Sequence, residues 1–594
     1  MDIKTLKALK PSEYSEAADG YRAISNTADA ARERIDKQVT KAMRKANEGA
    51  AADAAQKQLT KLSENFHYTQ VECGLITGAL DGFSFEIAAP RRRLLEALDD
   101  AAALGYAVSA EGDITFPAGG KNELTGAEIP GGTAVGNNGM LDSSNRGLYG
   151  PDNRGLYSPG TAGTGGLDIH RGNPHHAKAQ DIADRIAHAV AEAKLIDTRY
   201  SDALGQLKAA PGLSVTSKTW ADVASDVDAV SWAALDYVQD HIPMDKSPAD
   251  RKEWWDNLSE EERDEYKTAF PEIIGGLDGI PAVVRDEVNR ENLQMLIAKL
   301  EGQDDDTSRA QLEGMKGIQE KLSKPSQPPM FLLGIGDEGN GRAIVSYGNP
   351  DTSKNVSAYA PGLGTTLDGD FADDTVRRAY QTAKGAYKYD HSTASIVWLG
   401  YDAPGFTEVA STTLANRGAP AYSSFMEGIQ ATNENADPHV TAIGHSYGSL
   451  VVGTAAREHG GIPGVDDIVL LGSPGTGAQT ADELNVGKGH VFAASAGNDP
   501  VSWLPAASSL IGPAPAVVNF LDDERWFGRD PVSDDFGATR MESGDGPLPL
   551  WLSGEGPTPA HSGYFDSERN PSAANNVAKI VGGRPDLVTT EESR

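Results

Sequence analysis

The sequence predicts an α/β fold in which a mostly parallel sheet of about eight strands follows a large all-α region. Three observations support this prediction. At 594 residues the chain is too long for one hydrophobic core, so it must divide into several domains. Apolar residues recur every three or four positions through most of the first 324 residues, as in helices. From Met330 onward, short apolar runs alternate with helical segments, as in a sheet covered by helices on both faces.

These patterns predict five regions along the chain. They are a helical hairpin or bundle at residues 1–110, a Gly/Pro-rich flexible linker at 111–175, a second helical region at 176–328 that packs on the next domain, the α/β domain at 329–585, and a disordered tail at 586–594.

The first region is predicted to bury one apolar stripe between two or three long helices. The stripe consists of Tyr21, Ile24, Ala28, Ala31, Ile35, Val39 and Met43. The predicted linker is recognised by composition, since 15 Gly and 5 Pro fall among the 58 residues from Pro117 to Pro174. It contains the repeat NRGLY twice, at Asn145–Tyr149 and Asn153–Tyr157, which are too few copies for a repeat architecture.

Seven apolar runs are predicted as strands of the sheet, and a weaker run at Pro547–Leu552 is the candidate for an eighth. The seven are Met330–Leu333, Ala343–Tyr347, Val356–Ala360, Ser395–Leu399, Val440–Ile443, Asp467–Leu471 and His490–Ala494.

The string GIGDEG at Gly334–Gly339 resembles a dinucleotide-binding fingerprint, but a second strand follows it at once, where that fingerprint needs a helix. A β-hairpin is therefore predicted there.

The segment Gly444-His445-Ser446-Tyr447-Gly448 lies between a predicted buried strand and a predicted helix of small residues. A G-x-S-x-G turn in this position lifts the serine hydroxyl clear of the sheet, and the crowding explains the glycines Gly444 and Gly448. Ser446 is therefore the candidate nucleophile. The simpler interpretation is a serine that caps the following helix.

A serine needs a histidine as base and a carboxylate to orient that histidine. In this type of sheet the acid follows the second strand after the nucleophile, which selects Asp499. Beyond Asp499 the only histidine is His561, which is therefore the candidate base. His445 is predicted to support the site from outside it.

The oxyanion of such a reaction needs two backbone amides. One is assigned to Tyr447, and the other to Leu363 in the loop APGLGTT, where Gly362 and Gly364 allow close approach; an ordinary glycine-rich turn is the alternative. Tyr401 and Asp402 are predicted to line the entrance to the same site. Asp402 is expected either to bind substrate or to cap a turn. Residues Trp503–Phe520 are either a cap over an acyl pocket or a buried helix and loop.

The motifs GNPDTSKNVSAYAPGLGTT, WLGYDAP, GHSYGS, VLLGSPG, GNDPV, DPVSDDFGATR and HSGYF together resemble the α/β-hydrolase superfamily. More narrowly, they are similar to an actinobacterial hydrolase group, formerly of unknown function, with a G-H-S-Y-G nucleophile elbow. The resemblance covers about residues 329–582. It implies serine-dependent hydrolysis of an ester or related acyl bond, with Ser446, Asp499 and His561 in the matching positions.

The composition limits the classes of partner and of site that the protein can have. With 53 Lys and Arg against 86 Asp and Glu, the net charge of −33 repels nucleic acid. The single cysteine, Cys73, excludes an intramolecular disulfide and a multi-cysteine metal site. No metal or cofactor is required. No segment has the length of a transmembrane helix and the first residues lack an export signal, so the default compartment is the cytoplasm.

The sequence therefore predicts a serine hydrolase, esterase- or lipase-like, with thioester and peptide bonds as further substrate classes. Its substrate is expected to be a small-molecule or lipid-like acyl compound. The alternative is a helical interaction or export protein on a non-catalytic hydrolase scaffold. The first 106 residues resemble helical-hairpin modules of the WXG type, which are attached to substrates of a specialised secretion system, although Asn47-Glu48-Gly49 stands where W-x-G would be. That resemblance implies leaderless secretion and a protein partner for the N-terminal helices.

Overall fold

A computed structural model of the chain describes residues 1–592 except 123–124, 139–171, 209–214, 406–407, 504–523 and 549–557. The chain divides into two compact units. Met1–Ser214 and Asp226–Ile242 form the first unit, and Val215–Ser225 and Pro243–Arg594 form the second. The helices expected between 176 and 328 are thus shared between the units, whereas the sequence grouped them as one region.

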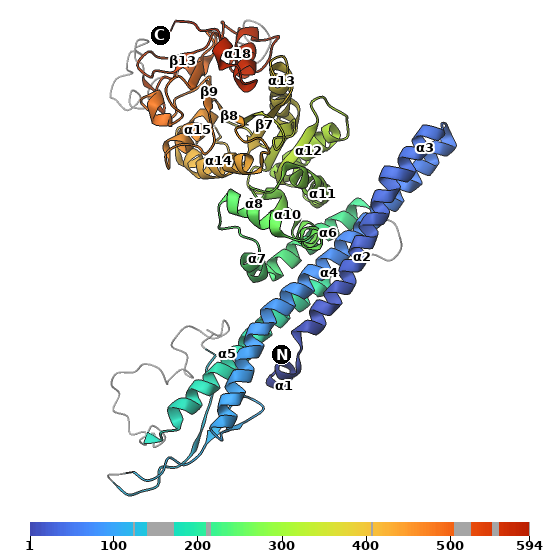
Figure 1. Cartoon of the computed structure of the whole chain (residues 1–594), viewed down its shortest axis with the longest axis vertical. Coiled ribbons are helices and arrows are strands. Elements are labelled where there is room, and N and C mark those ends of the chain that lie inside the picture. Colours follow the sequence, from blue (N-terminus) through green and yellow to red (C-terminus); the bar gives the residue numbers. More distant parts are fainter. Residues whose placement is uncertain are drawn as a thin grey trace. The chain divides into compact units, whose positions relative to one another are not determined.

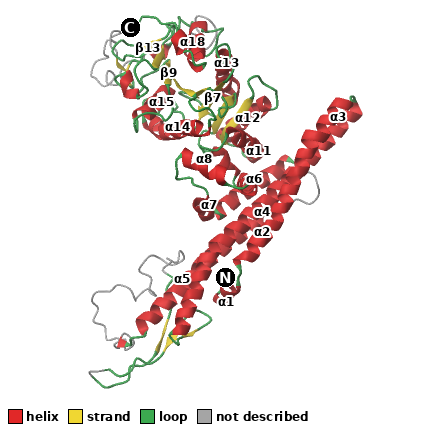
Figure 2. Cartoon of the chain, viewed as in Figure 1, coloured by secondary structure: helices red, strands yellow, loops and turns green. Residues whose placement is uncertain are grey.

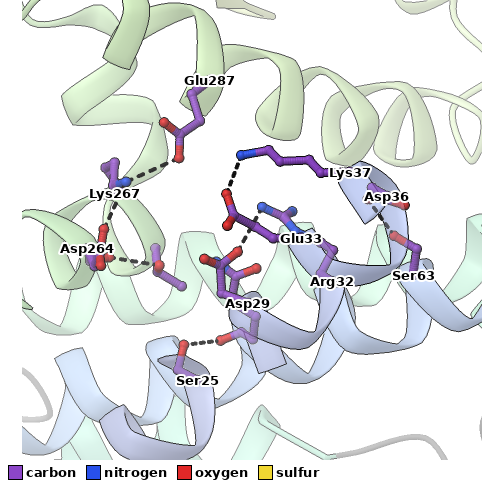
Figure 3. Close-up of polar contacts among 12 residues, drawn as sticks. Ser25, Asp29, Arg32, Glu33, Asp36, Lys37, Ser63, Asp264, Lys267 and Glu287 are labelled. Atoms are coloured by element: carbon purple, nitrogen blue, oxygen red, sulfur yellow. Dashed lines mark hydrogen bonds and ion pairs between the residues drawn. The ribbon is translucent and has the colours of Figure 1, made fainter. Parts of the chain in front are cut away.

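The first unit is built on a helical hairpin of α2 (Pro11–Glu33) and the long α4 (Ala50–Ala103) (Figure 1). The short helix α1 (Ile3–Ala8) precedes α2, and a π-helix (Arg34–Thr40) and α3 (Lys41–Ala46) continue it. Hydrogen bonds and ion pairs join the hairpin, as at Ser63 Oγ, which donates to Asp36 at 2.8 Å (Figure 3).

The predicted apolar stripe on α2 is only partly correct. Ala28 and Ile35 are buried, but Tyr21, Ile24 and Val39 are exposed. The buried positions of α2 are instead Ala18, Ser25 and Ala28, which are seven and three residues apart. Small side chains let the two helices approach closely, and Ser25 Oγ satisfies its polarity by donating to the carbonyl of Gln70 on α4 at 2.8 Å. The predicted stripe therefore overlaps the buried face at Ala28 and Ile35, but it also includes large apolar residues that are exposed and omits the buried Ala18 and Ser25.

Helix α5 (His176–Gln206) packs along α4 and completes the first unit together with α7 (Leu235–His241) and the last turns of α6 (Ser217–Ala233). A small antiparallel sheet of β1 (Ala107–Val108), β2 (Ile114–Phe116) and β3 (Gly132–Ala134) follows α4. Two of its strands lie where the sequence predicted linker. Ile114, Phe116 and Ala134 are buried, so these few apolar residues order a stretch that is otherwise rich in glycine. Most of the predicted linker, including both NRGLY repeats, lies outside the described residues.

Besides the first turns of α6, the described part of the second unit has five helices before its sheet, and the sheet has eight strands. The helices are α8 (Pro248–Asn257), α9 (Glu260–Ala269), α10 (Pro271–Gly276), α11 (Ala282–Leu300) and α12 (Asp306–Leu322). Lys267 of α9 pairs with Asp264 at 2.9 Å and with Glu287 of α11 at 3.1 Å, and so ties two of these helices together (Figure 3).

The sheet has the strand order β13-β10-β9-β8-β6-β7-β5-β4. Its strands are β4 (Met330–Gly336), β5 (Arg342–Tyr347), β6 (Asn355–Ala360), β7 (Thr393–Leu399), β8 (His439–His445), β9 (Asp467–Leu471), β10 (Val491–Ala494) and β13 (Thr539–Arg540). Only β5 runs antiparallel to its neighbours, and β4 pairs with it as a hairpin across Gly336 and Arg342. The hairpin prediction at GIGDEG is confirmed.

The predicted α/β fold with its mostly parallel sheet is also confirmed, and all seven predicted runs are strands. The eighth strand of the sheet is β13. Of the weaker candidate run, Pro547 and Leu548 are not in a strand, and residues 549–552 lie outside the described residues. With only two residues, β13 is too short to show an alternating pattern.

Helices cover both faces of this sheet (Figure 2). One face buries apolar residues of α14 (Thr413–Thr432) and α15 (Gly448–Arg457). The other face buries those of α11, α12, α13 (Val376–Ala386) and α18 (Pro571–Val581). The parallel strands are consequently buried on both sides, which explains their continuous apolar runs.

Side chains of α11 pair with the outer edge of β4, the last strand of the sheet. Asp286 accepts the Leu332 amide at 2.7 Å, Arg285 donates to the Leu333 carbonyl at 2.8 Å, and Arg290 donates to the Met330 carbonyl at 2.9 Å. An unpaired edge strand is a template for aggregation, so these contacts make α11 a part of the α/β domain.

Candidate active site

Ser446 occupies a tight turn between β8 and α15. Its φ of 55° is in the left-handed region, which is unfavourable for a residue with a side chain. The flanking glycines are needed for space: a Cβ on Gly444 would lie 2.6 Å from Ser449 Cα, and one on Gly448 would lie 2.0 Å from the Ala360 carbonyl oxygen. The Ser446 amide donates to the Leu471 carbonyl at 3.0 Å, which fixes the turn to the end of β9.

Asp499 and His561 form a hydrogen-bonded pair. Asp499 follows β10 and is fully buried, and His561 lies on the short helix α17 (Pro559–Ser562). His561 Nδ1 is 3.0 Å from Asp499 Oδ1 and 2.9 Å from Oδ2. Because a carboxylate accepts the Nδ1 proton, the other ring nitrogen, Nε2, carries no proton in the neutral ring.

Two further groups hold the Asp499 carboxylate. Tyr564 donates its hydroxyl to Oδ2 at 2.6 Å, and the Val501 amide donates to Oδ1 at 2.9 Å. The Tyr564 oxygen in turn accepts the Ala496 amide at 2.9 Å. The acid is therefore fixed from three sides.

The pair and the serine lie at the same edge of the sheet, at the carboxyl ends of β8, β9 and β10. Gly472, directly after β9, is the close neighbour of both partners, since a Cβ there would lie 2.6 Å from Asp499 Oδ2 and 2.9 Å from His561 Nδ1. The His561 ring lies 4.5 Å from the ring of His445, the residue before Ser446. In the described part of the chain, no hydrogen bond joins the Ser446 hydroxyl to His561. Such bonds are often long in ligand-free sites and tighten with substrate.

The loop after β6 lies against the serine. A Cβ on Gly362 would lie 2.6 Å from Ser446 Cβ and 2.9 Å from the Tyr447 amide nitrogen. Gly362, which precedes Leu363 in this loop, therefore lies beside the Tyr447 amide. Gly364, with a φ of 72°, donates its amide to the Pro404 carbonyl at 2.9 Å and anchors the loop.

Tyr401 and Asp402, which the sequence suggested as pocket residues, make structural contacts. Tyr401 is buried, and its hydroxyl donates to the Pro361 carbonyl at 2.7 Å, so it supports the loop that carries Gly362. Asp402 accepts two hydrogen bonds from the Arg342 guanidinium, at 2.8 and 2.9 Å, and one from the Asn340 amide at 2.9 Å. These hydrogen bonds hold the pKa of Asp402 below its usual value. Of the two alternatives for Asp402, the observed contacts favour the turn.

Tyr564 and Gly472 contact the Asp499–His561 pair, and the Tyr359 hydroxyl lies 3.5 Å from His445 Nδ1, although none of the three was predicted from the sequence. Tyr564 stands three residues after His561 in HSGYF, and Gly472 follows the β9 run in VLLGSPG, so both lie in recognised motifs.

The predicted cap lies outside the described residues except for Trp503. No group of His, Cys, Asp or Glu suited to a metal ion occurs among the described residues. Within the same residues, no helix combines the length and apolarity needed to cross a membrane.

Comparison with known proteins supports the assignment of the fold. Residues 337–509 match the model of a family described as alpha/beta hydrolase. The uncharacterized protein Mb0988c of Mycobacterium bovis is 34% identical over 222 residues, which are 36% of this chain and 82% of that protein. The uncharacterized protein Rv2079 of Mycobacterium tuberculosis is 28% identical over 459 residues, which are 69% of this chain and 67% of that protein. The chain belongs to the alpha/beta hydrolase family.

Proposed function

We propose that the protein is a serine hydrolase that cleaves an ester or a related acyl bond of a small-molecule or lipid-like substrate. The observation that carries the proposal is the hydrogen-bonded pair of the buried Asp499 and the partly buried His561, which lies at the same sheet edge as a serine in a strained turn. A serine with an ordinary role in capping a helix needs neither the strain nor the pair.

Each residue of the site has its own role in the proposed reaction. Ser446 Oγ attacks the acyl carbon while His561 Nε2 takes its proton, and the amides of Tyr447 and Leu363 donate to the oxyanion. His561 then returns the proton to the leaving group. A water molecule then attacks the acyl-enzyme with the same help from His561, which releases the acid and regenerates Ser446. Asp499 keeps Nδ1 protonated and stabilises the imidazolium throughout.

Labelling of the full chain with a fluorescent fluorophosphonate tests this proposal. We expect the label on Ser446 in the wild-type chain, located by peptide mass spectrometry, and only background labelling of Ser446→Ala. Ser495→Ala is the matched control. Ser495 is also buried near this sheet edge, and its hydroxyl has no hydrogen-bond partner among the described residues, so its removal breaks no contact. This control should label like the wild-type chain.

A folded wild-type chain that takes no label would contradict the proposal. It would favour the alternative of an interaction or export protein in which the hydrolase domain is a scaffold. Where labelling succeeds, comparison of p-nitrophenyl esters with the matching thioesters, at acyl chain lengths from acetyl to palmitoyl, identifies the substrate class.

A further inference from the structure

His445 is a buried histidine at the site to which the reaction above gives no role. It is the last residue of β8 and directly precedes Ser446. Its side chain is turned toward His561, because its Nε2 lies 2.7 Å from the His561 carbonyl oxygen and the two rings are 4.5 Å apart. Its Nδ1 lies 3.5 Å from the Tyr359 hydroxyl.

The partners of His445 determine its protonation. A carbonyl oxygen only accepts, so His445 Nε2 carries the proton and donates it. Arg378 donates to the Tyr359 oxygen at 2.8 Å, which leaves the Tyr359 proton free to point at His445 Nδ1. All donors and acceptors in this series of hydrogen bonds, from Arg378 through Tyr359 and His445 to the His561 carbonyl, are matched when His445 is neutral. Burial first, and then the charges of His561 and Arg378, lower the pKa of His445 well below its usual value.

We propose that His445 is a positioning residue that holds His561 in place by donating a hydrogen bond to its backbone carbonyl. The inference rests on the proposed function, because it assigns His561 as the base. Asp499 fixes the imidazole ring of His561, and His445 fixes the backbone that carries it, so the base has two independent anchors.

The second anchor is needed because α17 is a helix of only four residues. So short a helix has few backbone bonds of its own, such as those from the Ser562 amide to the Thr558 carbonyl and from the Gly563 amide to the Ala560 carbonyl, both at 3.2 Å. A neutral anchor also suits the reaction. When His561 becomes an imidazolium, a neutral His445 does not repel it, whereas a cationic side chain at the same distance would oppose the proton transfer.

Three substitutions in the full chain test this role. His445→Leu removes the donor, His445→Gln keeps an N–H near the position of Nε2, and Tyr359→Phe removes the hydroxyl that faces Nδ1. Each variant is measured for kcat and KM with p-nitrophenyl butyrate, for the rate of fluorophosphonate labelling, and for its thermal midpoint by circular dichroism.

We expect His445→Leu to lower kcat and the labelling rate by on the order of tenfold, with KM unchanged, since a base displaced by a fraction of an ångström loses its alignment. His445→Gln should recover most of this loss, and Tyr359→Phe should lower kcat by a smaller factor. His439→Gln is the matched control. His439 is also on β8 and hydrogen-bonded, to Asp467 at 2.7 Å, but it stands at the opposite end of the strand. Its substitution should leave kcat and KM unchanged.

The inference is overturned if His445→Leu keeps the wild-type kcat, if its loss appears in KM alone, or if His445→Gln performs no better than His445→Leu. Should His445→Leu fail to fold, a wild-type kcat in Tyr359→Phe overturns it. These outcomes differ from failure of the proposed function, in which the wild-type chain itself takes no label on Ser446 and shows no hydrolysis.

Discussion

Ser446 holds a backbone conformation that costs free energy in the folded state. With a φ of 55° it is in the left-handed region, where a Cβ costs about 1–2 kcal/mol. Strain of this kind persists only where the surroundings impose it, and here the end of β8, the start of α15 and the bond to Leu471 do so. The strain at Ser446 therefore lowers the stability of the folded state at the residue that we propose as the nucleophile.

This strain predicts an effect of substitution on stability that does not depend on the function. Ser446→Gly should unfold at a higher denaturant concentration than Ser446→Ala, because glycine adopts a positive φ without the Cβ penalty. We expect a difference of about 1 kcal/mol in the free energy of unfolding, after allowance for the greater freedom of glycine in the unfolded chain. Urea titration followed by circular dichroism measures it. An alanine variant as stable as the glycine variant would show that the turn is not strained.

The sequence indicated Ser446, Asp499 and His561 because each stands at a recognisable place, directly after a strand or as the last histidine of the domain. It did not indicate Tyr564 or Tyr359, because the bonds that tie them to Asp499 and to His445 depend on side-chain directions that no spacing records. For the same reason it did not indicate the hydrogen-bond partners of Tyr401 and Asp402, which are the Pro361 carbonyl and the Arg342 guanidinium.

Among the structural elements, the loop after β6 lies directly against the serine. Gly362 leaves no room for a side chain, and the buried Tyr401 donates a hydrogen bond to the same loop at Pro361. In the proposed reaction this contact would hold the Leu363 amide near the Tyr447 amide, and an oxyanion site depends on that placement.

Gly362→Ala should therefore reduce activity strongly. The added methyl group would lie 2.6 Å from Ser446 Cβ and must push the loop away from the Tyr447 amide. We expect kcat to fall by about 100-fold, the effect of losing one oxyanion donor. Gly369→Ala is the control, since a Cβ there meets only Glu313, at 3.9 Å. Equal activity of the two variants with p-nitrophenyl butyrate would remove this loop from the proposed site.

At the level of the whole molecule, the sequence predicted an α/β domain at residues 329–585 and, before it, a helical region at 176–328 that packs on it. The apolar runs begin at Met330, so the boundary was set at residue 329. The structure adds α8–α12 to the same unit, because Leu293 and Leu296 of α11 and Met315 and Ile318 of α12 are buried in the core on one face of the sheet. The sequence predicted that the helices before residue 329 pack on the α/β domain, but a helical pattern does not reveal which helices of residues 176–328 belong to that unit and which belong to the first.

The boundary leads to a prediction about fragments of the chain. A fragment of residues 243–594 should be soluble and should take the fluorophosphonate label, since it keeps both the site and α11. A fragment of residues 329–594 should aggregate. It loses Asp286, Arg285 and Arg290 from the edge of β4, and it exposes the core that α11 and α12 cover, at about 2 kcal/mol for each large apolar side chain. Size-exclusion chromatography and labelling of the two fragments in parallel distinguish the outcomes. Soluble, labelled protein from residues 329–594 would show that the α/β domain does not need these helices, whereas an unlabelled but folded 243–594 fragment would show that hydrolysis depends on the first unit.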